Sequence, residues 1–161
     1  MYKFQAKFYL KLIFLISLIS LISAYFIEFV LGHQPCNLCL IERIPYGISM
    51  ILIMVISIYQ KNEKFFILLL VLTFIFSLTI SIYHFGIEKG FFEESAICTI
   101  KNVSETLTKE DLLKQLNEKT VSCKDVTFRI FGLSLTSINI TISLFIIIML
   151  LKNYNLYEKN R

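Results

Sequence analysis

Charge is scarce in this sequence. Asp, Glu, Lys and Arg make up 17% of the 161 residues, whereas apolar residues make up 56%. A soluble domain usually carries about 25% charged residues, so the composition excludes an ordinary soluble domain and indicates a membrane protein. The net charge of +4 does not indicate a nucleic-acid partner, because the basic residues lie beside the apolar segments.

The uncharged segments are long. Four runs contain no Asp, Glu, Lys or Arg: Leu12–Ile27, Ile44–Tyr59, Phe65–Ile87 and Ile130–Leu151. A membrane-spanning helix needs about 20 mostly apolar residues; the last two runs reach this length alone, and the first two reach it with flanking residues. We therefore expect an all-α, integral membrane four-helix bundle that forms a single domain over residues 1–161. The expected helices cover residues about 9–30, 40–60, 65–87 and 131–151, with loops at about 31–39 and 88–130.

The first run has an alternative interpretation as a cleaved signal peptide. The basic start, with Lys3, Lys7 and Lys11, and the small residue Ala24 fit that alternative. However, the apolar stretch is longer than the roughly 7–15 residues of a signal peptide, and more spans follow it. A retained first helix is therefore the favoured prediction.

Basic residues are unevenly distributed between the two sides of this bundle. The terminal tails and the link at residues 60–64 together hold eight basic and two acidic residues, whereas residues 88–129 hold seven basic and eight acidic ones. Cytoplasmic loops of membrane proteins carry an excess of Lys and Arg. We therefore predict that both termini are cytoplasmic and that the loops at 31–39 and 88–130 face outward.

The cysteines all fall on the predicted outward side. Cys36 and Cys39 lie at the start of the second span, and Cys98 and Cys123 lie in the long loop. Disulfides persist in the oxidising space outside a bacterial cytoplasmic membrane. Because the orientation was derived from charge alone, its agreement with the cysteine positions supports two candidate disulfides.

The C-x-x-C pair of Cys36 and Cys39 has several interpretations. A zinc site needs further close ligands, but Cys98 and Cys123 are 25 residues apart and no histidine cluster accompanies them, so no metal is expected. A c-type haem needs His where the chain has Leu40, and a thioredoxin-like domain needs a βαβ unit. A structural or a redox-active pair is left. A bridge between cysteines three residues apart removes little chain entropy from the unfolded state, so it would stabilise the fold only weakly. A helix N-terminus stabilises a thiolate, which favours redox chemistry.

Arg43 and His84 are further candidates for this site. Arg43 follows Cys39 by four residues and Cys36 by seven, so the three side chains can share one helical face. Arg43 either anchors a lipid phosphate or pairs with Glu42, or it stabilises a cysteine thiolate or donates to a carbonyl of a bound acceptor. His84 lies at a similar depth near the end of the third span, as an interface residue or as part of the site.

The long loop contains the stretch LTKEDLLKQLNEK. Thr108 and Asp111 form a start that resembles a capping box, and Leu112, Leu113 and Leu116 form an apolar stripe. We expect either a small solvated helix or, preferably, a helix on the membrane surface that tethers the loop near the first cysteine pair.

These motifs resemble the disulfide bond formation protein B (DsbB) family. The likeness rests on CNLCLIER at residues 36–43, on the four spans and on the cysteine pair in the last outward loop. The flanks YHFGIEKGFFEESAIC and SCKDVTFRIFGLSLTSIN are also similar, so the resemblance covers essentially the whole chain. The departures are Pro45 and Tyr46 after the arginine, and the absence of tryptophan.

The resemblance implies a thiol:quinone oxidoreductase of the bacterial inner membrane. Such an enzyme reoxidises a soluble periplasmic DsbA-like oxidase with a thioredoxin fold, and it sustains disulfide bond formation in periplasmic proteins. The electron acceptor would be a membrane quinone, either ubiquinone or menaquinone. Arg43 and His84 would be the quinone-binding residues.

The resemblance also implies roles for the four cysteines. Cys98 and Cys123 would form the loop disulfide, and a thiolate of the partner would attack Cys98 and free Cys123. The electrons would then pass to the disulfide of Cys36 and Cys39, and Cys39 would transfer them to the quinone beside Arg43.

Two alternatives stay open. Vitamin K epoxide reductase-like proteins also combine four helices, a C-x-x-C motif and a loop cysteine pair with a quinone, but their C-x-x-C motif lies on the last helix rather than at the start of the second. A non-enzymatic membrane subunit with two structural disulfides would form no quinol from a dithiol partner and a quinone.

Overall fold

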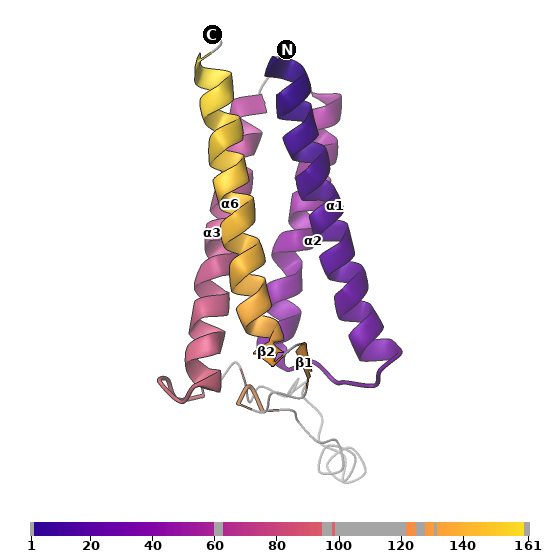
Figure 1. The fold of residues 1–161 in the computed structure, drawn as a ribbon, viewed down its shortest axis with the longest axis vertical. Helices are drawn as coiled ribbons and strands as arrows, with labels where there is room; N and C mark the ends of the chain where they lie inside the picture. The colour runs from indigo at the N-terminus through magenta and orange to yellow at the C-terminus, as the bar shows by residue number, and fades with distance from the viewer. Residues whose placement is uncertain are drawn as a thin grey trace, which may run out of the picture.

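The chain forms a bundle of four long helices in a computed structural model (Figure 1). The structure describes residues 2–59, 63–94, 98, 122–124, 128–130 and 132–159. The helices are α1 (Tyr2–Phe29), α2 (Asn37–Ile58), α3 (Glu63–Glu88) and α6 (Leu135–Lys159), and a two-stranded antiparallel sheet is formed by β1 (Arg129–Ile130) and β2 (Leu133–Ser134). Each of these helices is long and apolar enough to cross a membrane. The predicted all-α four-helix membrane bundle is thus confirmed.

The outer ends of α1 and α6 differ from the predicted bounds. α1 begins at Tyr2, although the apolar run predicts a start at about residue 9, and α6 continues to Lys159 rather than ending at about residue 151. The apolar run marks only the part of a helix that lies in hydrocarbon. Lysine, glutamate and glutamine are good helix formers, so the polar flanks continue the same helices. The predicted helix in the long loop, from Thr108 to Leu116, lies outside the described residues.

The termini and the segments that connect the helices lie at the two ends of the bundle. Figure 1 shows both termini at one end, and the link between α1 and α2 together with β1 and β2 at the opposite end. The chain segments that carry the excess of basic residues at the termini therefore lie on the same side. Which end faces the cytoplasm stays a prediction from charge.

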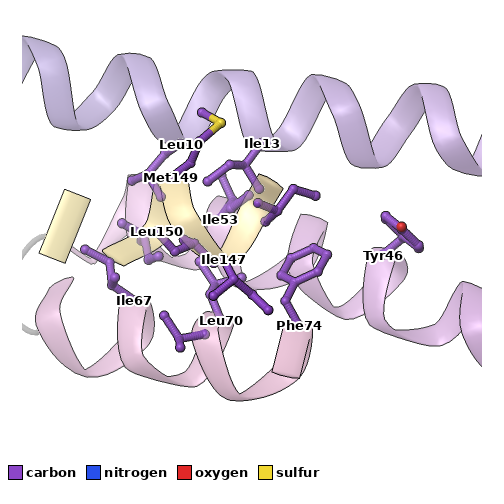
Figure 2. Close-up of a cluster of buried hydrophobic side chains, with 13 residues drawn as sticks. Leu10, Ile13, Tyr46, Ile53, Ile67, Leu70, Phe74, Ile147, Met149 and Leu150 are labelled. Atoms are coloured by element: carbon purple, nitrogen blue, oxygen red, sulfur yellow. The ribbon is translucent and has the colours of Figure 1, made fainter. Parts of the chain in front are cut away.

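The centre of the bundle is an apolar core to which all four helices contribute. Figure 2 shows a cluster of 13 buried side chains drawn from these helices. Phe74 of α3 is fully buried and meets the ring of Tyr46 of α2 edge-on, with 5.8 Å between the ring centroids. Large apolar side chains on the outer faces are exposed, for example Ile51 and Phe76, as expected for surfaces that contact lipid.

Small hydroxyl residues bring neighbouring helices close together. Ser49 of α2 donates to Ser17 of α1 at 3.0 Å, and the hydroxyls of Ser77 of α3 and Ser143 of α6 are 3.3 Å apart. All four side chains are fully buried. Small residues that allow close approach, with hydroxyls that bond across the interface, are typical of helix packing in membranes.

Pro45 lies in the interior of α2, nine residues into the helix. Proline has no backbone N–H, so the carbonyl of Ile41, four residues earlier, lacks its helical donor. α2 nevertheless continues to Ile58 as one helix. The proline therefore separates the first turns of α2, which carry the cysteine motif, from the part that packs in the core.

Candidate active site

The cysteine pair lies at the N-terminus of α2. Cys36 is the N-cap residue, with extended backbone angles (φ −72°, ψ 167°), and its sulfur accepts a hydrogen bond from the backbone N–H of Cys39 at 3.3 Å. The two sulfur atoms are 2.8 Å apart, and both residues are free thiols. The two sulfurs thus lie in contact, placed to form the predicted disulfide. A disulfide needs about 2.05 Å between the sulfurs, so the two states differ by a small movement.

His84 of α3 is in contact with this pair. Its Nε2 atom lies 3.6 Å from the Cys36 sulfur, and its Nδ1 atom lies 3.0 Å from Oε1 of Glu42. His84 is only 2% exposed. The ring is therefore held between a sulfur and a carboxylate, both from α2. This placement joins His84 directly to the sulfur chemistry rather than to the membrane interface.

Glu42 is the centre of a buried polar network. Its Oε2 atom accepts a hydrogen bond from the side-chain amide of Asn139 at 2.8 Å, and the same amide donates to Ser81 at 2.7 Å. The hydroxyl of Tyr46 donates to the Asn139 carbonyl oxygen. The network connects α2, α3 and α6 through hydrogen bonds. A carboxylate inside a membrane bundle is costly unless it is paired, and such residues usually mark functional sites.

Arg43 points away from the sulfurs and toward α1. Its guanidinium forms an ion pair with Glu28, and it lies over the ring of Tyr25 at 5.0 Å from the ring centroid. The predicted alternative of an Arg43–Glu42 pair is therefore wrong, because Glu42 bonds His84 and Asn139 instead. A guanidinium has five N–H donors, so the bond to Glu28 leaves other donors for a ligand.

A cavity of about 310 Å³ adjoins these groups between α1, α2 and α6. Its walls are mostly apolar, with Ile19 and Ile27 from α1 and Leu135, Ile138 and Ile142 from α6, and residues of α2 and α3 complete the lining. Its polar lining includes the cysteine pair together with Glu42, Arg43 and His84. Pockets of about 300–1,000 Å³ with apolar walls and a few polar groups are typical of small-molecule sites. The cavity therefore fits an apolar ligand with a polar head.

A disulfide joins Cys98 and Cys123 at the same end of the bundle. Both cysteines are buried, and they belong to one apolar cluster with Cys36, Leu38 and Ile87. Cys123 also lines the cavity. The fold thus brings two cysteine pairs that are far apart in the sequence into one cluster.

Glu94 connects the segment after α3 to the segment that carries Cys123. Its carboxylate accepts hydrogen bonds from the hydroxyl of Ser122 and from the backbone N–H of Lys124, the latter at 3.1 Å. The Ser122 hydroxyl, followed by the Lys124 amide and charge, lowers the pKa of Glu94. The carboxylate is therefore ionised at neutral pH and keeps both bonds.

Cys36 is predisposed to be a thiolate. The hydrogen bond from the Cys39 thiol is the main factor that lowers the pKa of Cys36 well below its ordinary value; burial opposes it, and the His84 ring adds to the decrease. Thiolates, not thiols, are the nucleophiles in disulfide exchange. The structure thus favours Cys36 as the reactive sulfur of the pair.

A pH profile of alkylation will test this. Because a lowered pKa keeps Cys36 ionised, its reaction rate with iodoacetamide should stay near its maximum down to about pH 6, whereas an ordinary thiol loses about tenfold per pH unit below about 8.5. Peptide mass spectrometry follows Cys36 in the reduced protein. Cys39→Ser retains a hydroxyl donor and should keep the plateau, and Cys39→Ala should shift the decline to higher pH. A wild-type midpoint near pH 8.5 would contradict the assignment.

The geometry defines a class: a four-helix membrane protein with a dithiol and a disulfide in one buried cluster beside an apolar cavity. The family model described as "Disulfide bond formation protein DsbB" matches residues 6–152. The chain belongs to the DsbB family, and it is accordingly a membrane oxidoreductase that forms disulfide bonds. The predicted family is thus confirmed.

Two curated relatives are similar to the chain. An uncharacterized protein of Rickettsia prowazekii is 28% identical over 137 residues, which cover 84% of this chain and 80% of the relative. A disulfide bond formation protein B of Xylella fastidiosa is 25% identical over 118 residues, which cover 70% of this chain and 68% of the relative. No solved structure matches the chain.

Proposed function

We propose that the protein is a thiol:quinone oxidoreductase of a bacterial inner membrane, with the cysteine end of the bundle facing the periplasm. It oxidises a soluble DsbA-like dithiol protein and transfers the electrons to ubiquinone or menaquinone. One observation carries the proposal: the loop disulfide and the α2 dithiol pack in one cluster, and both border an apolar cavity. Such contact supports electron transfer by exchange of sulfur bonds.

The first step takes place at the loop disulfide. A thiolate of the partner attacks Cys98, so that a mixed disulfide forms and Cys123 leaves as a thiolate. The second thiol of the partner then displaces Cys98, which gives the partner a disulfide and leaves Cys98 and Cys123 reduced. Two electrons have then moved from the partner to the loop.

The second step transfers these electrons to α2. With the α2 pair oxidised, the Cys123 thiolate attacks Cys36, Cys39 leaves, and Cys98 then displaces Cys36 to restore the loop disulfide. The products are a loop disulfide and an α2 dithiol. The structure contains the Cys98–Cys123 disulfide and places Cys36 in one cluster with both loop cysteines, which supports direct exchange between the two pairs.

The last step reoxidises the α2 pair at the cavity. A bound quinone would accept two electrons from the α2 pair and two protons, one from the Cys39 thiol and one from solvent. Its ring is apolar and planar with two carbonyl acceptors, and the cavity offers apolar walls with Cys39 and Arg43 on its lining. His84 contacts Cys36 at Nε2 and Glu42 at Nδ1, so it is placed to stabilise the Cys36 thiolate until the sulfur bond forms.

A quinone-reduction assay will test the proposal. The protein in lipid nanodiscs, supplied with a reduced thioredoxin-fold dithiol protein and ubiquinone or menaquinone, should form quinol at a rate that can be followed by absorbance. Cys36→Ser and Cys98→Ser should each reduce the rate to background. Thr79→Ala is the matched control, because this exposed hydroxyl bonds only the helix backbone.

The outcomes separate the alternatives. Full activity in both cysteine variants would contradict the electron path. No quinol from the wild-type protein with either quinone would favour a non-enzymatic subunit with structural sulfur bonds. The position of the C-x-x-C motif at the start of α2 favours the DsbB-like order of cysteines over the vitamin K epoxide reductase-like order.

A further inference from the structure

The reduced cysteine pair and His84 form a group of three metal-ligating side chains. The sulfurs of Cys36 and Cys39 and a ring nitrogen of His84 all lie within 4.8 Å of one another. Two thiolates and one imidazole are a donor set that selects zinc and similar thiophilic cations. In the second span the spacing of the cysteines gives two of these ligands, and the packing of α3 on α2 brings the third.

The distances are close to those of a zinc site. With zinc–sulfur bonds of about 2.3 Å and zinc–nitrogen bonds of about 2.0–2.1 Å, a sulfur and a nitrogen on a tetrahedral ion are about 3.6 Å apart, and two sulfurs are about 3.8 Å apart. The Cys36 sulfur and Nε2 of His84 are 3.6 Å apart, so this edge already has the spacing of a metal site. The two sulfurs are 2.8 Å apart, so Cys39 has to move outward by about 1 Å.

The residues that support His84, Glu42 and Asn139, are also arranged as they are around the histidine ligands of metal sites. A histidine ligand usually donates its other ring N–H to a carboxylate, which fixes the tautomer and the orientation of the ring. The Nδ1 atom of His84 lies 3.0 Å from Oε1 of Glu42, so Nε2 is the ring nitrogen that faces the Cys36 sulfur. Asn139 in turn bonds the other oxygen of Glu42 at 2.8 Å. The imidazole ring is thus oriented toward the sulfurs before any ion binds, and ion binding displaces a proton from Nε2.

We propose that the reduced form of the protein binds one zinc ion through Cys36 Sγ, Cys39 Sγ and His84 Nε2. The fourth position faces the cavity, which all three residues line. Binding exchanges the ion for the thiol protons and transfers no electrons. The oxidised pair offers no thiolates and does not bind the ion. Zinc therefore holds the pair in its reduced state and blocks its sulfurs from exchange, which makes the site a redox-dependent metal site distinct from electron transfer.

Metal titration of the reduced protein will test the proposal. The reference protein is Cys98→Ala/Cys123→Ala, in which the α2 pair supplies the only cysteines. After reduction with a phosphine and desalting, Zn²⁺ alone is added in competition with a chromophoric chelator. We expect one ion per protein, and no binding after oxidation of the pair. In the same background, Cys39→Ser and His84→Ala should abolish tight binding.

Two further variants make the test specific. Glu42→Gln should weaken zinc affinity about 10–100-fold, as loss of a second-shell partner does. His33, the other histidine of the chain, also lines the cavity; with a solvent ligand in the fourth position, His33→Ala should leave the affinity unchanged. Circular dichroism shows whether each variant keeps its helices, and His84→Gln replaces His84→Ala if the latter unfolds.

Cobalt gives an independent readout. Co²⁺ in the reduced reference protein should produce the charge-transfer absorption of thiolate ligands, which Cys39→Ser should reduce. Three outcomes overturn the proposal: equal zinc binding by the oxidised protein, unchanged affinity in a folded His84 variant, or no binding by the reduced reference protein. None of these outcomes affects quinol formation, so the test is independent of the proposed electron path.

Discussion

Replacing Cys39 by serine is expected to stop turnover completely and to trap a bond between Cys36 and Cys123. Cys36 keeps its position in the cluster that also contains Cys98 and Cys123. Without the Cys39 thiol, a Cys36 thiolate that attacks the loop disulfide at Cys123 releases Cys98 and forms a new disulfide that no neighbouring thiol on α2 can resolve. Capture of the released Cys98 by a maleimide makes the product permanent.

Mass spectrometry of a non-reduced digest will identify the product of that variant. The expected species is a peptide pair that contains Cys36 and Cys123, together with a maleimide on Cys98. Cys36→Ser is the matched control, because it keeps one thiol at the site but removes the one in the buried cluster. A bond from Cys36 to Cys98 would reverse the proposed roles of the loop cysteines, and no bond at all would refute direct exchange between the pairs.

Replacing Arg43 by alanine is expected to raise the KM for quinone about tenfold to a hundredfold. A hydrogen bond from a charged donor contributes about 1.5–3 kcal/mol, and each 1.4 kcal/mol corresponds to about tenfold in affinity. Arg43 lines the cavity but lies away from the sulfurs, because its partners are Glu28 and Tyr25 of α1. The exchange between the protein and its dithiol partner should therefore keep its rate.

A second variant separates ligand binding from wall structure. Glu28→Gln removes the charge of the Arg43 partner but keeps the guanidinium, so the KM for quinone should stay close to that of the wild type. The measurements are steady-state quinol formation at varied quinone and single-turnover formation of the mixed disulfide with the partner. An equal increase of KM in both variants would assign the ion pair to the shape of the cavity, and an unchanged KM in Arg43→Ala would exclude a contact with the acceptor.

Much of the fold follows from the sequence because a bilayer permits few solutions. The runs Phe65–Ile87 and Ile130–Leu151 predict spans from length and composition alone. The outer ends of α1 and α6 were not predictable in this way. Hydropathy reports where a helix meets hydrocarbon, whereas the backbone hydrogen bonds of α1 continue into polar residues as far as Tyr2.

The site was predictable only where it is local in the sequence. The position of Cys36 and Cys39 at a helix start follows from the second apolar run, Ile44–Tyr59, which is too short to span a membrane unless its helix begins near Cys39. Glu42 was considered only as a partner for Arg43, yet successive helical residues do not face each other, so Glu42 turns to α3 and α6 while Arg43 turns to α1. Asn139 was not singled out, although an amide in an otherwise apolar span is a signal that could have identified it.

The helix that carries Cys39, α2, is interrupted in its backbone hydrogen bonding at Pro45, directly after the turns that carry the cysteine motif. In the proposed cycle, formation of the α2 disulfide brings the two sulfurs from 2.8 Å to about 2.05 Å. A continuous ladder of backbone bonds would transmit that change along the whole span. Because Pro45 has no backbone N–H, one helical hydrogen bond is missing after the first two turns of α2. We therefore expect these two turns to move with the sulfurs while the core around Phe74 and Ile53 keeps its packing.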